Sequence, residues 1–437
     1  MKAPRSRNPC RQVRQSWLPE EKTNEICNIQ QGWQYLRKGK NMSNKPLSGY
    51  TVIDFSAVYA GPICTRFLRD CGAEVIKIEP PEMGDLTRGA QGMTPAFAHF
   101  NAGKRSLALN LKTAEGQQLA GALVRQADIV VQNFRPGIMA RFGLDHDSLM
   151  PQQPKLVYCS ISGFGQSGPW NDRAAFAPIV HAASGFDTVF AAGQPDFGER
   201  PPNWDIMVAD MLTGAYAFGA IQTALLGRER FGQGEHLDIS MMEAMMSLIP
   251  AQLQAVQMEK PLPIGRFYPV RTMDGFVMIT PVTNKIFQRL CELLNRSELL
   301  KDPRFVYGKR TNHYRELATE VEQWSCTLST KECVEALNAV GVPCSDYARL
   351  EDLFDHSQCL ERESFSSVSA QPFGEFLIQS LPIKFQNMSS KSASWVPVLG
   401  QHSQEILSTM LKLSTTEIDR LHCQGIIHCS EAEVSLP

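Results

Sequence analysis

The sequence predicts an α/β protein that has a parallel sheet in a large domain and a second, smaller α+β domain. Short β-branched runs alternate with amphipathic stretches over residues 46–250, a pattern typical of successive βαβ units in a doubly wound sheet. After Pro261 the pattern changes to a hairpin followed by helices, which predicts the smaller domain over residues 265–360. The tail, residues 365–437, follows separately.

Five strands are expected in the first half of the large domain. The strand "YTVIDFS" precedes a helix, "ICTRFLRDCG", which ends in glycine as many helices do. Further strands are expected at "AEVIKIEPP", "KRSLALNL", "DIVVQNF" and "KLVYCSIS". Thr113 is expected to cap the helix between the third and fourth strands.

The stretch "NWDIMVADMLTGAY" precedes a longer helix that reaches about Leu226. Local pattern favours Asp210 as the N-cap of this helix and assigns no role to Asp205. A carboxylate at a helix start also lies near free N–H groups and the positive end of the helix dipole. Such a position suits a catalytic carboxylate as well as an N-cap, so local pattern leaves both interpretations of Asp210 open.

Two further patterns predict local structure. "MMEAMMSLIPAQLQAV" is expected to form one methionine-rich helix whose methionines fill the core. "YPVRTMDGFVMITP" is expected to form a hairpin that turns at Asp274–Gly275 and opens the smaller domain.

Composition excludes several classes of function. The formal net charge of the 437 residues is −2, so no basic field favours the binding of nucleic acid or of an anionic membrane. No apolar run is long enough to span a membrane. The 12 cysteines are scattered without a C-x-x-C pair, so no bound metal is expected.

Residues 1–45 are expected to be a disordered extension. Within it, residues 1–41 are either a transit peptide or the result of translation that starts upstream of Met42. A cytoplasmic protein is expected, or a mitochondrial one if residues 1–41 are a transit peptide.

Three weaker signals have ordinary explanations. "GFGQSG" follows a strand but runs into Pro169 instead of a helix, which argues against a dinucleotide site. In "NAGKRS", Lys104 and Arg105 either meet phosphates or lie in a solvated loop. His181 lies in an apolar stretch and is expected to be a half-buried, satisfied histidine in preference to a catalytic base.

Several segments taken together resemble the class III CoA-transferase family, which includes formyl-CoA transferase, carnitine CoA-transferases and the related α-methylacyl-CoA racemases. They are "PLSGYTVIDFSAVYAGPICTRFLRDCGAEVIKIEPPEMGDLTRG", "FNAGKRSLALNLKTAEG", "ADIVVQNFRPGIMARFGLD", "PKLVYCSISGFGQSGPW" and "VADMLTGAYAFGAIQTALLGRERFGQGEHLDISMMEAM". "YPVRTMDGFVMI", "DPRF", "NAVGVPCSDY" and "PVLGQHSQEIL" extend the resemblance to about residue 425. The resemblance implies an interlocked homodimer and a Rossmann-like, CoA-binding large domain over residues 46–250 that residues 365–437 complete.

The resemblance also implies a chemistry and a set of site residues. The aspartate of the family's D-x-x-T/S-G segment, here Asp210 with Thr213 and Gly214, attacks an acyl-CoA thioester and forms aspartyl anhydride and aspartyl-CoA intermediates. An acyl-CoA and a carboxylic acid are then the substrates, and no permanently bound cofactor is implied. The positions matching the family's CoA site are Tyr59, Ala60, Leu109, Asn110, Lys112, Asn133, Phe134, Arg135 and Arg141.

Departures from the family pattern bear on the substrate. Many members carry G-Y-D or G-H-D where this chain has Ala175, Phe176 and Ala177, and the racemases use that histidine to move the α-proton. Phe176 therefore argues against racemase activity, and Ala177 and the missing glycine-rich lid argue against oxalate. Phe176, Ala177, His181 and the loop near Arg266 are expected to shape the acceptor pocket. The sequence thus favours a CoA-transferase that uses Asp210 as nucleophile, with a racemase, epimerase or lyase that uses Asp210 as base as the alternative.

Overall fold

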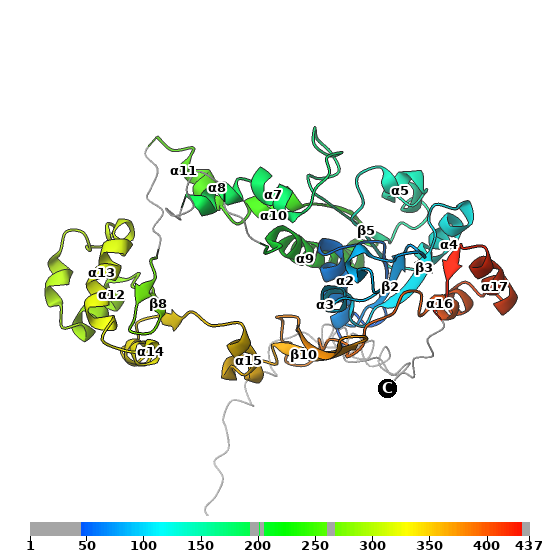
Figure 1. The fold of residues 1–437 in the computed structure, drawn as a ribbon. Coiled ribbons are helices and arrows are strands. Elements are labelled where there is room, and N and C mark those ends of the chain that lie inside the picture. Colours follow the sequence, from blue (N-terminus) through cyan, green and yellow to red (C-terminus); the bar gives the residue numbers. More distant parts are fainter. Residues whose placement is uncertain (1–44, 193–200, 202–204, 260–266, 431–437) are drawn as a thin grey trace, which may run out of the picture.

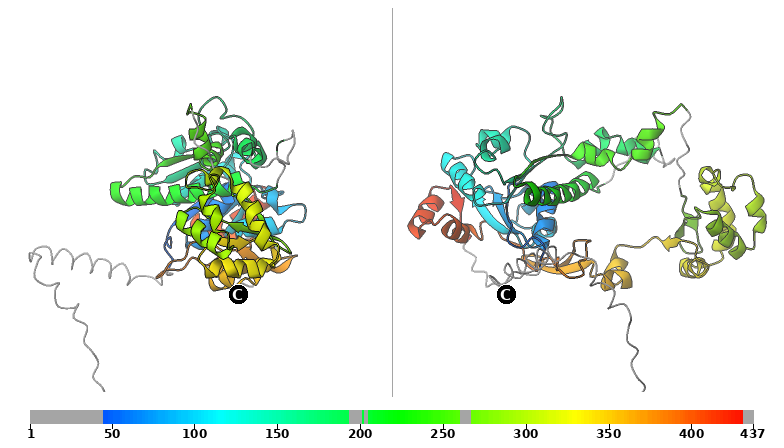
Figure 2. Two further views of the ribbon diagram at one scale, coloured as in Figure 1. Left: turned by 90° about the vertical axis from the view of Figure 1, so that its left-hand side faces the viewer. Right: turned by 180° about the vertical axis from the view of Figure 1, so that it is seen from behind.

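The computed structural model describes residues 45–192, 201, 205–259 and 267–430. Figure 1 shows a large body built around one sheet and a small lobe that stands to one side of it. The chain enters the small lobe after α11 (Pro250–Ala255) and leaves it between β9 (Cys344–Asp346) and α15 (Ser357–Glu361). The view from behind in Figure 2 shows the same separation of body and lobe.

The sheet of the body has seven strands in the order β12-β3-β2-β1-β4-β5-β6. Six pair in parallel, and β12 pairs with β3 in the antiparallel direction. The strands are β1 (Thr51–Asp54), β2 (Glu74–Glu79), β3 (Arg105–Leu109), β4 (Ile129–Gln132), β5 (Val157–Ser162), β6 (His236–Ser240) and β12 (Ile427–His428). The strand order reverses between β1 and β4, and open α/β sheets bind ligands at the carboxyl ends of the strands beside such a reversal. The predicted fold class is confirmed.

Helices cover both faces of the sheet because alternate residues of each buried strand point to opposite sides. In β4, Val130 packs into one core with α4 (Ala114–Val124), α16 (Ser403–Met410) and α17 (Thr415–Cys423). Its neighbours Ile129 and Val131 pack into the other core with α2 (Ala60–Asp70) and α9 (Val208–Phe231). The expected cap of α4 is confirmed, since the Thr113 hydroxyl accepts the Gly116 N–H at 3.1 Å.

Shorter elements lie along the edges of the body. They are η2 (Leu86–Arg88), α3 (Pro95–Asn101), α5 (Ile138–Arg141), α6 (His146–Leu149), α7 (Ala177–Ala183), α8 (Phe186–Ala191), α10 (Met241–Met246), β10 (Phe365–Ala370) and β11 (Gly374–Gln379). The single methionine-rich helix expected after β6 is wrong. Pro250, which lacks an N–H, divides it into α10 and α11. Core filling by methionine is confirmed, because Met241 and Met245 are buried against Val180 of α7.

The small lobe combines a three-stranded antiparallel sheet with helices. Its elements are β7 (Val270–Arg271), β8 (Phe276–Ile279), α12 (Asn284–Leu293), η4 (Ser297–Lys301), η5 (Arg310–Asn312), α13 (Tyr314–Ser325), α14 (Thr330–Ala339) and β9, with η6 (Glu351–Phe354) following. The expected hairpin turn is confirmed by the hydrogen bond from the Thr272 N–H to the Gly275 carbonyl at 2.9 Å. The domain boundaries expected from the sequence stay a prediction.

Helices α2 and α9 approach each other at Gly214. A Cβ on Gly214 would lie 2.1 Å from the Ile63 Cγ2 atom and 2.7 Å from the Ala60 carbonyl oxygen. Hydrogen is therefore the only side chain that this contact accepts without movement of α2. The Thr213 hydroxyl, also buried, donates to the Ala209 carbonyl one turn earlier and is satisfied within α9.

We predict that Gly214→Ala lowers the free energy of unfolding by about 1–3 kcal/mol, because overpacking forces the helices apart. Gly219→Ala on the same helix is the control, since no atom lies within 4 Å of its added Cβ, and alanine favours a helix interior. Denaturant unfolding of the two variants checks this. Equal stability of Gly214→Ala and Gly219→Ala would contradict the close contact.

Candidate active site

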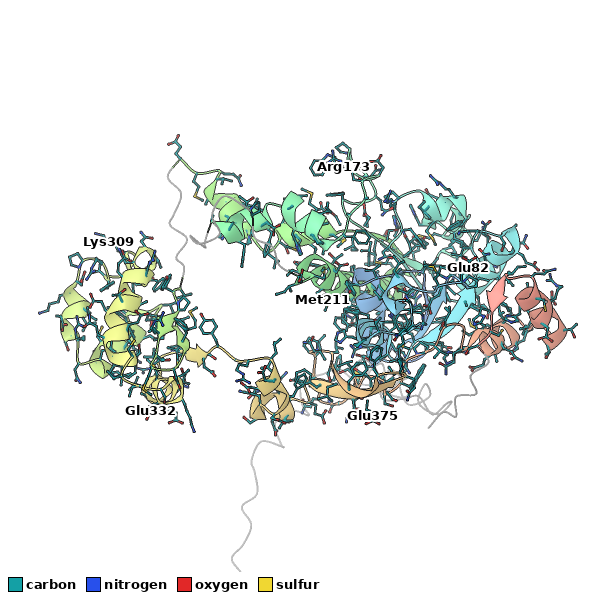
Figure 3. All side chains as sticks on the ribbon, in the orientation of Figure 1. Glu82, Arg173, Met211, Lys309, Glu332 and Glu375 are labelled. Atoms are coloured by element: carbon teal, nitrogen blue, oxygen red, sulfur yellow. The ribbon has the colours of Figure 1, made fainter. Side chains whose placement is uncertain are left out.

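Two cavities lie at the carboxyl ends of the strands, on either side of the strand reversal. The first, about 280 Å³, is lined by Asp210 and by residues of the loops after β1, β4 and β5. The second, about 460 Å³, is lined by residues that follow β1, β2, β3 and β4. Ala57, Leu86 and Phe134 line both, so the cavities adjoin. Figure 3 labels Glu82 of the second cavity, Arg173 on the loop after β5, and Met211 beside Asp210 on α9.

Asp210 lies in the first turn of α9, and Met207 occupies the N-cap position. The interpretation of Asp210 as the N-cap is therefore wrong, because the helix begins two residues before it. Its side chain faces Ala60, the first residue of α2, so the N-terminal ends of two helices converge on one carboxylate. Free N–H groups and helix dipoles make such a junction favourable for negative charge.

Burial nevertheless raises the pKa of Asp210 to about 6. Hydrogen bonding from the backbone N–H groups of Ala60 and of Asp210 itself acts in the opposite direction and is the weaker effect. Only 8% of Asp210 is exposed, and desolvation disfavours the charged form of a carboxyl group. The carboxylate is thus mostly ionised at neutral pH but poorly solvated, which is a typical environment for a reactive group.

His181 lies on α7 behind the start of α9. It is 2% exposed, and its Nε2 atom accepts the Ala209 N–H at 3.0 Å. Accepting this bond requires the neutral imidazole, and burial lowers the pKa of His181. The expectation that His181 is hydrogen-bonded within the protein is confirmed, although its side chain is buried and not half-buried.

The loop between β1 and α2 is fastened to the loop after β4 by Asn133. Its Oδ1 atom accepts the Ala57 N–H at 2.9 Å, and its Nδ2 atom donates to the Ala57 carbonyl at 2.8 Å. The Asn133 amide thereby holds the two loops in register. Phe134 and Arg135, the next residues, line the cavity that contains Asp210.

The structure brings most of the expected CoA-site residues to the two cavities. Ala60, Asn133, Phe134 and Arg135 line the first cavity, and Leu109, Asn110, Lys112 and Phe134 line the second. Tyr59 and Arg141 do not line either one. Tyr59 packs on Phe100 with ring centroids 4.8 Å apart, and Arg141 is exposed at the end of α5. Their roles in CoA binding stay predictions.

Other expectations resolve differently. Lys104 does not lie in a solvated loop. It is completely buried, and its Nζ atom lies 3.0 Å from the Asp54 Oδ2 atom. Phe176 lines the first cavity, whereas Arg266 is outside the described residues.

Three polar side chains at and beyond the end of β5 were not expected from the sequence. Ser162, Asn171 and Arg173 all line the cavity that contains Asp210. The buried Ser162 hydroxyl has no hydrogen-bond partner, and the Arg173 guanidinium rests 4.0 Å from the centre of the Trp170 ring. The one available signal was their position after a strand of a parallel sheet, since loops there carry ligand-binding groups.

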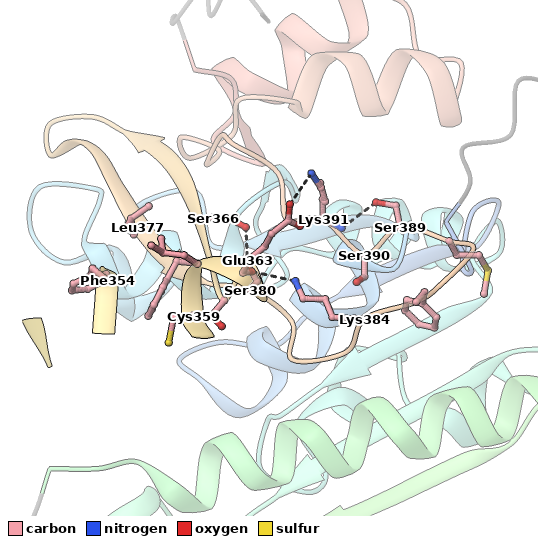
Figure 4. Close-up of a pocket in the computed structure, with 15 residues that line it drawn as sticks. Phe354, Cys359, Glu363, Ser366, Leu377, Ser380, Lys384, Ser389, Ser390 and Lys391 are labelled. Atoms are coloured by element: carbon pink, nitrogen blue, oxygen red, sulfur yellow. Dashed lines mark hydrogen bonds and ion pairs between the residues drawn. The ribbon is translucent and has the colours of Figure 1, made fainter. Parts of the chain in front are cut away.

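Among the described residues, no group of three or more His, Cys, Asp or Glu side chains is arranged to hold a metal ion, and no helix is long and apolar enough to cross a bilayer. A larger hollow of about 550 Å³ lies beside β10 and β11 and is shown in Figure 4. None of the expected site residues lines it, so volume alone does not locate the site.

The chain is similar in sequence to proteins of a known family. The sequence pattern of CoA-transferase family III matches residues 47–403. This chain belongs to CoA-transferase family III. It is 32% identical over 403 residues to the succinate–glutarate CoA-transferase of Agrobacterium fabrum, with 85% of this chain and 97% of that protein covered. It is 30% identical over 410 residues to the succinyl-CoA:glutarate CoA-transferase of Mus musculus, with 90% and 92% covered.

Solved structures of similar sequence have the same fold. The D175A mutant of Rv3272 from Mycobacterium tuberculosis superposes with a TM-score of 0.76 at 29% identity, and 83% of this chain and 99% of that one are covered. A CAIB/BAIF family protein from Brucella suis superposes with a TM-score of 0.70 at 30% identity, and 84% and 100% are covered. Membership of the CoA-transferase family, expected from the sequence, is confirmed.

The raised pKa of Asp210 predicts that this group destabilises the protein at neutral pH. A carboxyl whose folded-state pKa lies above its unfolded value of 3.8 contributes stability that is fully present below pH 3.8 and is lost as pH rises through about 6. We expect the free energy of unfolding of Asp210→Asn at pH 8 to exceed that of the unsubstituted protein by up to about 3 kcal/mol, at 1.36 kcal/mol per pKa unit. The difference should shrink towards pH 4. Denaturant unfolding at both pH values measures it, and an unchanged difference would contradict the assigned pKa.

Proposed function

We propose that this CoA-transferase moves CoA from an acyl-CoA to a carboxylic acid, with Asp210 as the nucleophile. The observation that carries the proposal is the position of Asp210. It lies in a cavity that adjoins a second cavity lined by the expected nucleotide-binding residues. The nucleotide end of CoA occupies the second cavity, and the thioester reaches Asp210 past Phe134, which lines both.

The exchange proceeds in four balanced steps. The Asp210 carboxylate attacks the thioester carbonyl, the C–S bond breaks, and an aspartyl anhydride and CoA thiolate result. The thiolate attacks the aspartyl carbonyl of the anhydride, which gives aspartyl-CoA and releases the first acid as a carboxylate. The second carboxylate attacks the carbonyl of this thioester, the C–S bond breaks, and a new anhydride and CoA thiolate result. The thiolate then attacks the second acid's carbonyl, which yields the new acyl-CoA and restores Asp210 without net proton transfer.

The surroundings of Asp210 support each attack. Its low exposure leaves the ionised carboxylate weakly solvated and therefore reactive. The Ala60 N–H, at the start of α2, faces this carboxylate and would donate to an oxygen that becomes negative when the aspartyl carbonyl is attacked. Lys112, Arg135 and Arg141 supply positive charge for the phosphates of CoA.

We propose dicarboxylic acids as the substrate class. The relatives named for succinate–glutarate and succinyl-CoA:glutarate exchange act on acids with two carboxyl groups, and one from Chloroflexus aurantiacus is named for succinyl-CoA and malate. In this chain Arg135 and Arg173 line the cavity around Asp210, so one guanidinium remains for a carboxylate that does not react. The alternative of a racemase is less well supported, since Phe176 lines this cavity where a histidine would be needed.

A homodimer is also proposed, in the interlocked form that the family resemblance implies. Large apolar side chains are exposed on α9 and beyond α11, among them Phe231 at 80% and Val256 at 83%. Monomeric proteins rarely leave large apolar patches uncovered.

We propose a cytoplasmic location, or a mitochondrial one if residues 1–41 act as a transit peptide. Imaging of the chain with and without those residues distinguishes the two locations.

We predict that Asp210→Ala abolishes CoA exchange between succinyl-CoA and glutarate and forms no adduct that hydroxylamine or borohydride detects, because the nucleophile is missing. Asp205→Ala, which removes an exposed loop carboxylate five residues earlier, is the matched control and should retain full activity and adduct formation. Normal exchange by Asp210→Ala would refute the mechanism. Deuterium incorporation at the α-carbon without acid exchange would favour the racemase.

The dimer is tested separately by sedimentation. We expect a molecular mass near twice the 48.7 kDa of one chain, because a second copy is needed to cover the exposed apolar side chains. Phe231→Glu should weaken association, since it introduces a charge into the interface. Sedimentation of the unsubstituted protein as a monomer at micromolar concentration would contradict the proposal.

A further inference from the structure

The loop that carries Ala60 to Asp210 contains a strained residue. Val58 has a φ of 70°, in the left-handed region that β-branched residues rarely occupy. Such a conformation costs about 1–3 kcal/mol and persists only where the surroundings hold it. Ala60 follows two residues later, and its N–H is the group that faces the Asp210 carboxylate.

Buried side chains hold the backbone at Val58 and immediately before it. The Lys77 Nζ atom donates to the Ser56 carbonyl at 2.7 Å. Both oxygens of the Asp85 carboxylate lie 3.2 Å from the Val58 nitrogen and accept its N–H. The polar groups of Ala57 are already bonded to Asn133, so residues 56–58 are held at each position.

Asp85 and Lys77 form an ion pair with 2.9 Å between the Nζ and Oδ2 atoms, and both side chains are completely buried. Burial disfavours the charged form of Asp85, but Lys77 and the Thr87 N–H outweigh it and lower its pKa. A charged acceptor binds an N–H about twice as strongly as a neutral one, which suits Asp85 to hold a strained turn.

We propose that Asp85 and Lys77 are a positioning pair for Asp210, which acts by holding Val58 in its left-handed turn so that the Ala60 N–H faces the carboxylate. Both residues also line the second cavity, so the pair lies between the proposed nucleotide site and the reacting carboxylate. The inference rests on the proposed role of Asp210. It assigns to a buried ion pair a function beyond packing, although the pair contacts neither Asp210 nor the first cavity.

The pair is tested with Asp85→Asn. Because this change leaves Lys77 without its partner, the double variant Lys77→Met/Asp85→Asn is measured beside it and removes both charges. With succinyl-CoA and glutarate, we expect kcat to fall at least about tenfold, by analogy with the loss of a preorganised donor. We also expect the acidic limb of the kcat/KM profile to move to higher pH, because the N–H that lowers the Asp210 pKa is displaced.

Val58→Gly is expected to restore part of the lost kcat in the Asp85→Asn background, since glycine adopts positive φ without strain. Asp70→Asn is the matched control. It disrupts another buried ion pair, with 3.2 Å between the Arg66 Nε and Asp70 Oδ2 atoms, on α2 away from the loop. The Asp70→Asn substitution should lower the free energy of unfolding without moving the acidic limb of the kcat/KM profile.

Two results would overturn the positioning role. One is an unchanged kcat and pH profile in the folded double variant. The other is a shift of the acidic limb in Asp70→Asn that is as large as the shift in Asp85→Asn. Hydroxylamine trapping separates this failure from failure of the proposed mechanism. If the unsubstituted protein forms the aspartyl adduct and the double variant does so at the same rate, Asp210 is the nucleophile and the pair does not position it.

Discussion

The close approach of α2 and α9 at Gly214 is the contact on which the site depends. It places the first N–H of α2 against a carboxylate in the first turn of α9, so the positive ends of two helices meet at Asp210. A side chain at Gly214 would separate the two helices and withdraw Ala60 from Asp210. The glycine of the D-x-x-T-G segment therefore has a packing role, which in turn sets the electrostatics of the aspartate.

Buried charges reinforce this junction from the side of the sheet. Lys104 pairs with Asp54 at the end of β1, and Lys77 pairs with Asp85 beneath the following loop. Burial lowers the pKa of Lys104 to about 8, which shows how strongly its surroundings oppose charge. Charged pairs in such surroundings seldom add stability compared with apolar residues. Their placement around a strained loop at the active site is more consistent with holding geometry than with stabilising the fold.

The environment of Asp210 combines two opposed effects. Burial raises its pKa and makes the ionised form reactive, whereas the N–H groups of two helices keep it ionised at neutral pH. His181, which accepts the Ala209 N–H, satisfies a neighbouring donor at the start of α9 without adding a charge. The site thus retains a carboxylate that costs folding energy, as functional groups often do.

The amino-acid sequence alone was enough to predict the fold class, the family and Asp210 as the candidate nucleophile. Periodicity sufficed for strands β1 to β5 because each of these β-branched runs is buried between two layers of helices, but it did not predict β12, which completes the sheet. Ordered motifs along the chain carried the resemblance to the family. Three-dimensional contacts were needed to show that Met207 and not Asp210 occupies the N-cap position of α9, that Lys104 is buried against Asp54, and that Ser162 and Arg173 line the cavity. These properties arise where segments distant in the chain meet. Local pattern carries no information on desolvation, on the approach of α2 to α9, or on the buried pair that holds Val58.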